Sequence, residues 1–331
     1  MFQAIFLARE GERFEAAVRS ISEDELVRQT PGAEVLLEVE YSTVNYKDAL
    51  ALTNRSPIVR RWPMVAGIDC AGRVAASDDP RWRVGEKVVL NGCGLSEQHW
   101  GGLAQKARAR ADWLVALPSR FTTRQAMEIG TAGYTAALAV GALEWAGVQP
   151  SSGDILVTGA TGGVGSIAIA LLAARGYRIA ASTGKPSEAQ YLKRLGASEA
   201  IDRKELSAPG KPLQSERWAG VIDSVGSHTL VNACAQTKSG GAVAACGLAQ
   251  GMDFPATVAP FILRAVNLLG INSVYVPHER REAAWRLLAE ALDPSLLESI
   301  IREVPLAGAF DVARDILDGR NVGRVVVNVN R

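Results

Sequence analysis

The sequence has few of the residues that mark secreted, metal-binding or nucleic-acid-binding proteins. Its 331 residues include only four cysteines, which lie far apart with no Cys-x-x-Cys pair. That spacing argues against a disulfide framework and against a structural zinc lobe, and it fits a reducing cytoplasm. The formal net charge is only +1. Because such a chain spreads no basic field, we expect no nucleic-acid partner.

Segments typical of export or of membranes are also missing. Met1 to Ala8 has no basic start and no cleavage-like end, so it predicts a first β-strand rather than a signal peptide. The longest uncharged run, Ile155 to Ala174, is long enough by length alone to cross a bilayer. Its four glycines divide it into a short strand and a short helix. We therefore expect a cytoplasmic protein with no membrane partner.

The chain length and the hydrophobic pattern predict two domains. Up to about Pro118 apolar residues recur mostly with period two, which favours a compact, partly closed β-barrel. One helical interruption, Asn45 to Leu52, places polar side chains at the barrel edge. Beyond Pro118 strands near residues 155, 179, 199, 220, 242 and 267 alternate with helices, which predicts an α/β, doubly wound parallel sheet. We expect the last strand, Arg324 to Val329, to return to the barrel.

A glycine-rich turn follows the strand at Ile155 to Val157. It has glycines at positions 159, 162, 163 and 165, and a helical pattern comes next. A helix N-terminus offers unpaired N–H groups and partial positive charge to a phosphate, and glycine lets the ligand approach. The Gly-x-x-Gly-x-x-Gly spacing departs from the usual fingerprint and alone could be a structural turn. In its strand–turn–helix context it predicts a dinucleotide site at Thr161, Gly162, Gly163 and Val164.

The end of the second predicted strand indicates which dinucleotide binds. NAD enzymes place a carboxylate there, whereas NADP enzymes use cations and hydroxyls for the 2′-phosphate. Thr183, Gly184 and Lys185 include a hydroxyl, a cation and no acid, so they predict NADPH. Arg203, just after the third strand, can approach the same phosphate. The alternative is that Lys185 and Arg203 are ordinary solvated surface charges.

Longer motifs lie in order over nearly the whole chain. They are Thr43-Val44-Asn45-Tyr46-Lys47-Asp48-Ala49-Leu50, Gly67-Ile68-Asp69-Cys70-Ala71-Gly72, His99-Trp100-Gly101-Gly102-Leu103-Ala104, Gly130-Thr131-Ala132-Gly133-Tyr134-Thr135-Ala136, the glycine turn, Trp218-Ala219-Gly220 and Ala245-Cys246-Gly247-Leu248-Ala249. They resemble the medium-chain dehydrogenase/reductase superfamily, and within it the zinc-free acrylyl-CoA reductases that are often labelled quinone oxidoreductases. Cys93 stands where that family usually has Trp, which could alter the pocket wall and substrate preference.

The resemblance implies a fold and domain boundaries. It implies a Rossmann doubly wound sheet at residues 125–274, which binds NADPH. It also implies a GroES-like β-barrel catalytic domain at residues 1–124, completed by residues 275–331. In the superfamily two sixth strands pair across a two-fold axis. Since Asn267 to Tyr275 is apolar and lacks the lysines or prolines that blunt an exposed edge, we expect a homodimer.

The resemblance also implies how the chemistry is run. Zinc members carry Gly-His-Glu where this chain has Gly67-Ile68-Asp69, and isoleucine cannot ligate a metal, so we expect no metal site. In the family the tyrosine at Tyr46 contacts the nicotinamide end, and Asn45 and Asp48 are candidate substrate contacts. A phenol can donate a hydrogen bond to an enolate without a metal. The alternative is that Tyr46 packs in the barrel core and Asp48 only caps the short helix.

Other residues carry weaker predictions. The family implies cofactor contacts at Ile262 and Ser273, and we expect Leu248 to line the nicotinamide ribose. His99 is interpreted as structural, Lys47 as a solvated or structural charge, His228 and His278 as surface residues, and Cys246 as buried rather than nucleophilic. Arg55, Arg60 and Arg61 could meet the phosphates of coenzyme A or form a solvated loop.

Three functions compete on this sequence. The first is NADPH-dependent reduction of acrylyl-CoA or a similar short 2-enoyl-CoA. The second is a quinone reductase that uses the same cofactor and makes no phosphate contacts with its substrate. The third is a non-catalytic NADPH-binding protein. The stretch from Asn45 to Asp48 counts against the third, because a purely structural protein need not retain polar groups facing the cofactor.

Overall fold

The computed structural model describes residues 1–298 and 301–331, and the chain forms two compact units. The first unit comprises residues 1–131, 273–289 and 297–331. The second unit comprises residues 132–272 and 290–296. Each unit has its own sheet system and its own buried apolar core.

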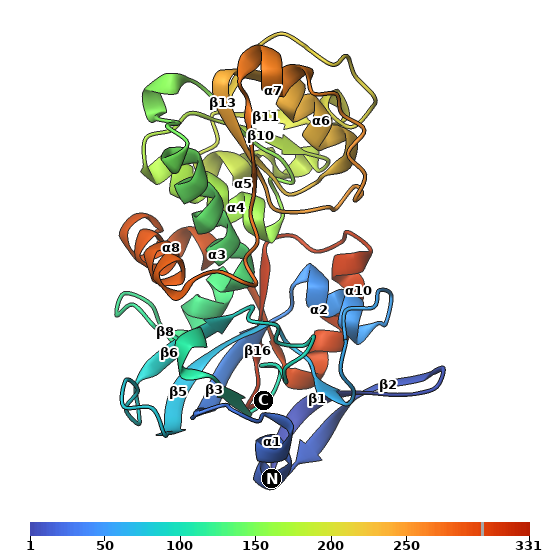
Figure 1. The fold of residues 1–331 in the computed structure, drawn as a ribbon, viewed down its shortest axis with the longest axis vertical. Coiled ribbons are helices and arrows are strands. Elements are labelled where there is room, and N and C mark those ends of the chain that lie inside the picture. Colours follow the sequence, from blue (N-terminus) through green and yellow to red (C-terminus); the bar gives the residue numbers. More distant parts are fainter. Residues whose placement is uncertain (299–300) are drawn as a thin grey trace. The chain divides into compact units, whose positions relative to one another are not determined.

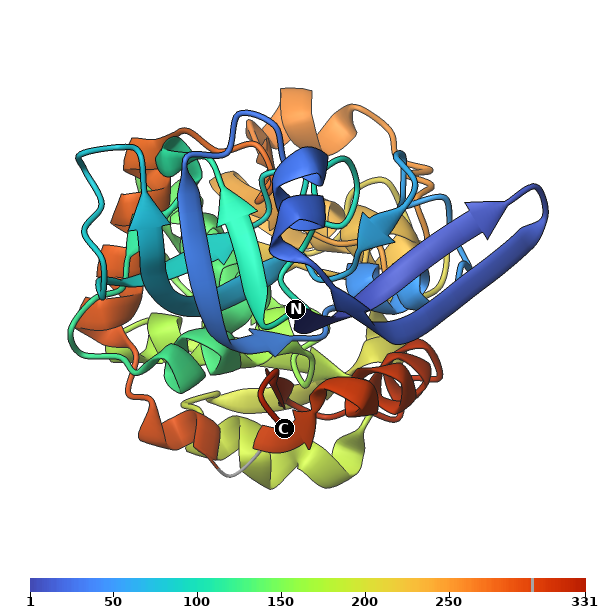
Figure 2. The ribbon, with the colours of Figure 1, turned by 90° about the horizontal axis from the view of Figure 1, so that it is seen from below.

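The first unit is built on two β-sheets. Its strands are β1 (Phe2–Glu10), β2 (Arg13–Ile21), β3 (Val35–Thr43), β4 (Met64–Val65), β5 (Asp69–Ser77), β6 (Lys87–Asn91), β7 (Lys106–Ala109), β8 (Val115–Ala116), β15 (Ile301–Pro305) and β16 (Arg324–Asn328). The larger sheet has the order β15-β16-β3-β5-β6-β8, with β7 beside β3, and the smaller has the order β2-β1-β4. Figure 2 shows the β1–β2 hairpin projecting beyond the strands of this unit.

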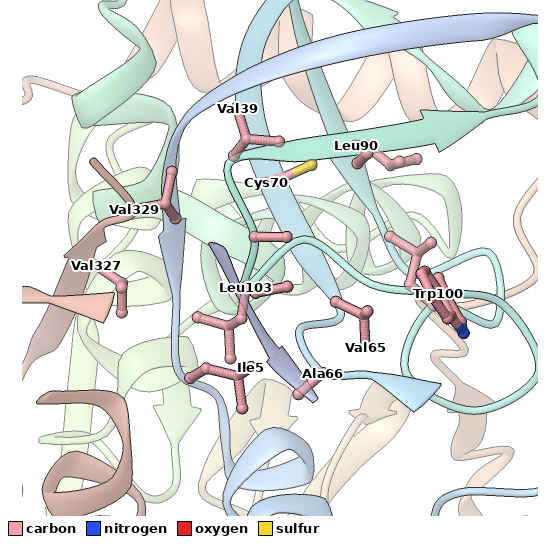
Figure 3. Packing of buried hydrophobic residues seen from close by; sticks show 14 of the residues in the cluster. Ile5, Val39, Val65, Ala66, Cys70, Leu90, Trp100, Leu103, Val327 and Val329 are labelled. Carbon is pink, nitrogen blue, oxygen red and sulfur yellow. The ribbon is translucent and has the colours of Figure 1, made fainter. Parts of the chain in front are cut away.

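The two sheets form the predicted, partly closed barrel because β1 and β3 both make backbone hydrogen bonds to the segment from Leu103 to Gln105. The Ile5 N–H donates to the Leu103 carbonyl at 2.9 Å, and the Val39 N–H donates to the Gln105 carbonyl at 2.9 Å. From Val35 to Val39 on β3 the buried residues alternate with half-buried or exposed ones, as the period-two pattern predicts. Figure 3 shows Ile5, Val39 and Leu103 packed together in the resulting core.

The C-terminal strand returns to this barrel, as predicted. β16 pairs antiparallel with β3, with Val326 opposite Thr43. β15, which pairs parallel with β16, was not expected from the sequence. The α-helices α1 (Glu23–Gln29), α2 (Tyr46–Leu52) and α10 (Ala309–Leu317) belong to this unit, and α8 (His278–Ala291) and α9 (Ser295–Glu298) each contribute residues to both units. In Figure 1 α10 lies beside α2, and the two helices pack on each other.

The second unit is a six-stranded parallel sheet, which confirms the doubly wound prediction. Its strands are β9 (Ile155–Val157), β10 (Ile179–Thr183), β11 (Glu199–Asp202), β12 (Trp218–Asp223), β13 (Thr237–Ala245) and β14 (Asn267–Gly270). The spatial order is β11-β10-β9-β12-β13-β14, so the order reverses between β9 and β12. In sheets of this kind ligands bind at that reversal, beyond the carboxyl ends of the strands.

Helices between these strands cover the sheet. They are α4 (Gly163–Ala174), α5 (Ala189–Arg194), α6 (Ser227–Gln236) and α7 (Ala259–Arg264). From the centre of the sheet the chain moves outward one way through β9, β10 and β11, and the other way through β12, β13 and β14. Because crossovers are right-handed, α4 and α5 cover one face of the sheet and α6 and α7 cover the other. β9 is wholly buried between them, as an inner parallel strand should be.

Helix α3 (Thr123–Trp145) begins in the first unit and continues into the second. Its start is a capping box: the Thr122 hydroxyl accepts from the Gln125 N–H at 3.1 Å, and the Gln125 side chain accepts from the Thr122 N–H at 3.0 Å. Gly130 interrupts the helix at φ 52°. Among the described helices α3 has the length and hydropathy of a membrane span, but 78% of that window is buried, as in core helices.

Candidate active site and cofactor site

The glycine turn after β9 has the geometry of a phosphate cradle. A Cβ at Gly159 would lie 2.4 Å from the Ser224 hydroxyl, and one at Gly165 would lie 2.5 Å from the Gly159 carbonyl. Gly162 is the N-cap of α4, is exposed, and has no capping side chain. The first N–H groups of a helix have no intrahelical acceptor. The turn therefore offers donors and positive dipole charge to a diphosphate.

A second group of predicted residues gathers at the end of β10. The Thr183 hydroxyl accepts from the Lys185 N–H at 3.0 Å, which orders the turn after the strand. A Cβ at Gly184 would lie 2.6 Å from the Arg203 Nε, so the exposed Arg203 side chain lies across this glycine. The structure brings Thr183, Gly184, Lys185 and Arg203 together, and none of them is acidic. This arrangement suits a phosphate monoester.

Thr161 links the two groups. Its hydroxyl lies 3.5 Å from the Thr183 hydroxyl, and both side chains are buried. The turn residues Gly163 and Val164 are half-buried at the start of α4. A dinucleotide that carries an extra phosphate fits these features. They are the glycines where a Cβ would clash, the helix start without a capping side chain, and the cluster of hydroxyl and guanidinium groups.

The remaining predicted cofactor residues are more scattered. Leu248 and Ile262 are exposed on the second unit, at 48% and 72% of their surface. Ser273 lies in the first unit, where the backbone passes the loop after β6: a Cβ at Gly92 would lie 2.8 Å from the Ser273 carbonyl. Leu248 and Ile262 therefore lie in one unit, and Ser273 lies in the other.

Cys246 is half-buried rather than fully buried as predicted, and its surroundings disfavour the thiolate. Its thiol donates to the Asp223 carbonyl at 3.2 Å, and burial raises the pKa of Cys246 to about 12. A thiol with so high a pKa holds almost no thiolate at neutral pH.

In the first unit Tyr46 stands at the start of α2. Its side chain is 48% exposed, so the alternative that it packs in the core is wrong. Asp48, two residues on, is completely buried. Its carboxylate accepts from the Asn45 N–H and the Ile68 N–H, both at 2.9 Å. Asp48 thus caps the helix and ties it to Ile68, while Tyr46 faces outward.

Asn45 connects Asp48 to a second buried acid. Its Nδ2 donates to Asp48 at 3.1 Å and to both carboxylate oxygens of Asp69 at 3.3 Å. Its Oδ1 accepts from Nη1 of Arg324 at 3.0 Å. Asp69 also accepts from the Thr131 N–H at 2.6 Å. The amide of Asn45 is therefore fully used inside the protein.

Arg324 supplies the positive charge of this cluster. Its Nη2 donates to the Thr43 hydroxyl at 3.0 Å, and its Nε donates to the Glu128 carbonyl at 3.0 Å. A Cβ at Gly130 would lie 2.2 Å from the Arg324 Nη2, so the guanidinium needs a glycine in the α3 kink. We call Asn45, Asp48, Asp69 and Arg324 the buried polar cluster.

The electrostatics of the cluster follow from two acids that share one arginine. Burial raises the pKa of Asp48, and the Asp69 charge raises it further. Burial also raises the pKa of Asp69, against which the Arg324 charge acts. Burial lowers the pKa of Arg324, while both carboxylates oppose that effect. The cluster holds together because almost every polar atom has a partner at short range.

Arg324 and Asp69 were missed as members of the candidate site. Asp69 was considered only as a lost metal ligand, and Arg324 only as the start of the last strand. A signal was available: both are charged residues on segments that otherwise predict buried strands, and buried charges require partners.

The other polar residues near α2 have structural partners. Lys47 forms an ion pair with Glu97, which is nearly buried. The His99 ring lies 4.7 Å from the Trp113 ring, and burial followed by the charges of Arg61 and Arg110 lowers its pKa. These contacts agree with the structural interpretation of Lys47 and His99.

The two remaining histidines are half-buried rather than fully exposed. His278 lies 3.3 Å from Glu282, and His228 is half-buried on α6. Within residues 1–298 and 301–331 no three His, Cys, Asp or Glu side chains gather as metal ligands.

The comparisons with known proteins cover both units. The Alcohol dehydrogenase GroES-like domain family matches residues 31–119, and the Zinc-binding dehydrogenase family matches residues 163–290. The Acrylyl-CoA reductase AcuI of Ruegeria pomeroyi is 50% identical over 100% of both chains. The Probable acrylyl-CoA reductase AcuI of Escherichia coli K12 is 48% identical over 99% of this chain and 100% of its own.

A solved structure agrees with the fold. The yhdH oxidoreductase from Salmonella enterica, in complex with NADP, has a TM-score of 0.95 and 47% identity, over 99% of each chain. The chain belongs to the medium-chain dehydrogenase/reductase superfamily. Within it the chain groups with the acrylyl-CoA reductases, as its motifs predicted.

The buried polar cluster predicts a pH-dependent stability defect in Arg324→Gln. The Arg324 charge is the largest of the effects that lower the pKa of Asp69 against burial, so its loss raises that pKa further. A carboxyl whose pKa is higher in the folded protein than in the unfolded chain contributes stability while it is protonated. This contribution is fully present below the unfolded pKa of about 4 and is lost as pH rises through the folded pKa. We expect a loss of about 3–5 kcal/mol at pH 8 and a clearly smaller loss at pH 5, measured by urea unfolding.

The matched control is Arg320→Gln. Arg320 is exposed and pairs with Asp315 and Asp318 on the surface, so its loss should change stability little at either pH. An Arg324→Gln defect of equal size at pH 5 and pH 8 would contradict the charge balance described above.

Proposed function

We propose that the protein catalyses the NADPH-dependent reduction of the C=C bond of acrylyl-CoA or a similar short 2-enoyl-CoA, without zinc. The observation that carries this proposal is the full-length likeness to acrylyl-CoA reductases, which extends through the Tyr46 segment. Ile68 stands where zinc members have a metal ligand, and its backbone N–H is bonded to Asp48.

The residues of the second unit suit the cofactor. The turn at Thr161 to Val164 would hold the diphosphate of NADPH, and Thr183, Gly184, Lys185 and Arg203 would hold its 2′-phosphate. Leu248 remains a predicted contact of the nicotinamide ribose, and Ile262 and, from the first unit, Ser273 remain predicted cofactor contacts. When bound, NADPH supplies the hydride for the β-carbon of the substrate.

The chain's own catalytic group in this proposal is Tyr46. Reduction at the β-carbon builds negative charge on the thioester oxygen before the α-carbon is protonated. The exposed phenol of Tyr46 can donate a hydrogen bond to that oxygen or relay a proton. Asn45 and Asp48 were candidate substrate contacts, but their polar atoms are used inside the buried polar cluster. We therefore assign them a positioning role, holding the start of α2.

The proposed function is tested by following NADPH oxidation with acrylyl-CoA, crotonyl-CoA and a quinone side by side. We expect the highest kcat/KM with acrylyl-CoA. Faster turnover of the quinone would support the quinone reductase function instead, and no turnover of any substrate would favour a non-catalytic NADPH-binding protein.

Lys185→Ala should weaken NADPH binding by roughly ten- to a hundredfold and leave NADH binding nearly unchanged. A charge-assisted hydrogen bond contributes about 1.5–3 kcal/mol, and tenfold in affinity is about 1.4 kcal/mol. Fluorescence titration with both cofactors measures the effect, and Lys193→Ala, exposed on α5, is the control. Equal weakening of both cofactors would refute the 2′-phosphate assignment.

Tyr46→Phe should lower kcat for acrylyl-CoA by about 10²–10³-fold, since it removes a donor to the developing oxyanion. The ring and its packing remain, so NADPH affinity and thermal stability should stay close to those of the wild type. Reduction of a quinone, which needs less help from this donor, should fall less. Full activity of Tyr46→Phe with acrylyl-CoA would mean that another group is the donor.

We also propose a homodimer formed through β14, in a cytoplasmic protein. Support comes from the position of β14 at the sheet edge and from its mostly exposed residues. The domain boundaries at residues 1–124 with 275–331 and at 125–274 belong to the same proposal. Sedimentation velocity at micromolar concentration should give a dimer, and a monomer there would rule out this interface.

A further inference from the structure

The segment between α2 and β4, residues 53–63, carries three arginines and no acidic residue. From the sequence alone Arg55, Arg60 and Arg61 could not be ranked, because a run of cations is usually a solvated loop. The structure distinguishes them by what each guanidinium contacts.

Two of the three arginines have partners. Arg61 donates to the Gln29 carbonyl at 3.0 Å and to its side-chain oxygen at 2.7 Å, which fixes the guanidinium against α1. Arg55 lies 4.0 Å from the Asp318 carboxylate, so an acid already stands beside its charge. The Arg60 side chain is exposed and forms no hydrogen bond or ion pair with any residue that the structure describes.

Although its side chain is free, the backbone of Arg60 is fixed. The Arg60 N–H donates to the Glu97 carbonyl at 2.8 Å. The carboxylate of the same Glu97 forms the ion pair with Lys47, the residue next to Tyr46. Two short contacts therefore connect the Arg60 backbone to the helix that presents Tyr46, so the point from which the exposed side chain extends is fixed relative to that helix.

The charges around this segment favour an anionic ligand. Glu97 is neutralised by Lys47, so it leaves no net negative charge beside Arg60. The positive charge of the region already acts on His99, whose pKa is lowered by burial and then by Arg61 and Arg110. An exposed guanidinium in such surroundings binds phosphate well, because its planar donors match two phosphate oxygens.

We propose that Arg60 binds a phosphate of the coenzyme A part of the substrate, an inference that rests on the proposed function. A CoA thioester carries its phosphates at the far end of a long, uncharged pantetheine arm. A cation whose backbone is anchored on the same unit as Tyr46, in the segment that follows α2, can bind that end while the acyl group reacts. Arg60 would then set substrate affinity and take no part in the chemistry.

The test compares crotonyl-CoA with crotonyl-pantetheine, which has the same reacting group and no phosphate. Arg60→Ala should raise KM for crotonyl-CoA about tenfold, with kcat unchanged, and leave KM for crotonyl-pantetheine as in the wild type. Arg60→Lys should recover part of the loss. Arg55→Ala is the matched control and should change neither KM by more than about twofold, since exposed pairs contribute little.

The outcomes separate this inference from the proposed function. If Arg60→Ala changes KM for both thioesters equally, or for neither, Arg60 does not bind the phosphate although the reductase activity stands. If the wild-type protein reduces neither thioester, the proposed function fails and the role of Arg60 fails with it.

Discussion

The buried charge of Arg324 is the interaction on which the candidate catalytic segment depends. The arginine comes from the strand at the C-terminal end of the described chain and enters a region that already holds Asp69 and Asp48. Each acid alone would be costly to bury, and two would repel each other. One guanidinium between Asn45 and Thr43 makes the arrangement tolerable, so the fixed start of α2 depends on the return of β16 to the barrel.

This constraint explains why the polar residues from Asn45 to Asp48 do not act alike. The side chains of Asp48 and Asn45 form their hydrogen bonds with other groups of the protein. Lys47 is held by Glu97. Of the four residues only Tyr46 has an exposed side chain. The start of α2 that carries it is held in place by the hydrogen bonds of its neighbours. Rigid support of this kind is what a hydrogen-bond donor needs to stabilise charge in a transition state.

Much of the fold could be predicted because it follows from local sequence patterns. Period-two segments, the capping box at Thr122 and the alternation of strands and helices identify both units. The gathering of the predicted cofactor residues, Thr161 to Val164 and Thr183 to Lys185, could be predicted for a topological reason. Strand ends in a parallel sheet lie at one edge, so residues just after β9 and β10 meet there.

The rest could not be predicted from local patterns. The contact between Arg324 and Asn45 joins residues 279 positions apart, and no spacing rule reports it. Whether Asp48 touches substrate or caps a helix depends on its burial, which the sequence leaves open. The ranking of Arg60 above Arg55 and Arg61 needs the partners of each guanidinium. Ile262 and Ser273 rest on family resemblance alone.

In the proposed function this barrel edge supports enoyl-CoA reduction by hydrogen bonds, without a metal. Its most direct test is the rate of NADPH-dependent conversion of acrylyl-CoA to propionyl-CoA by protein treated with a strong chelator, with its metal content measured by mass spectrometry. Full activity at well under one metal ion per chain is the predicted result. Activity that disappears on chelation and returns when zinc is added would contradict the account.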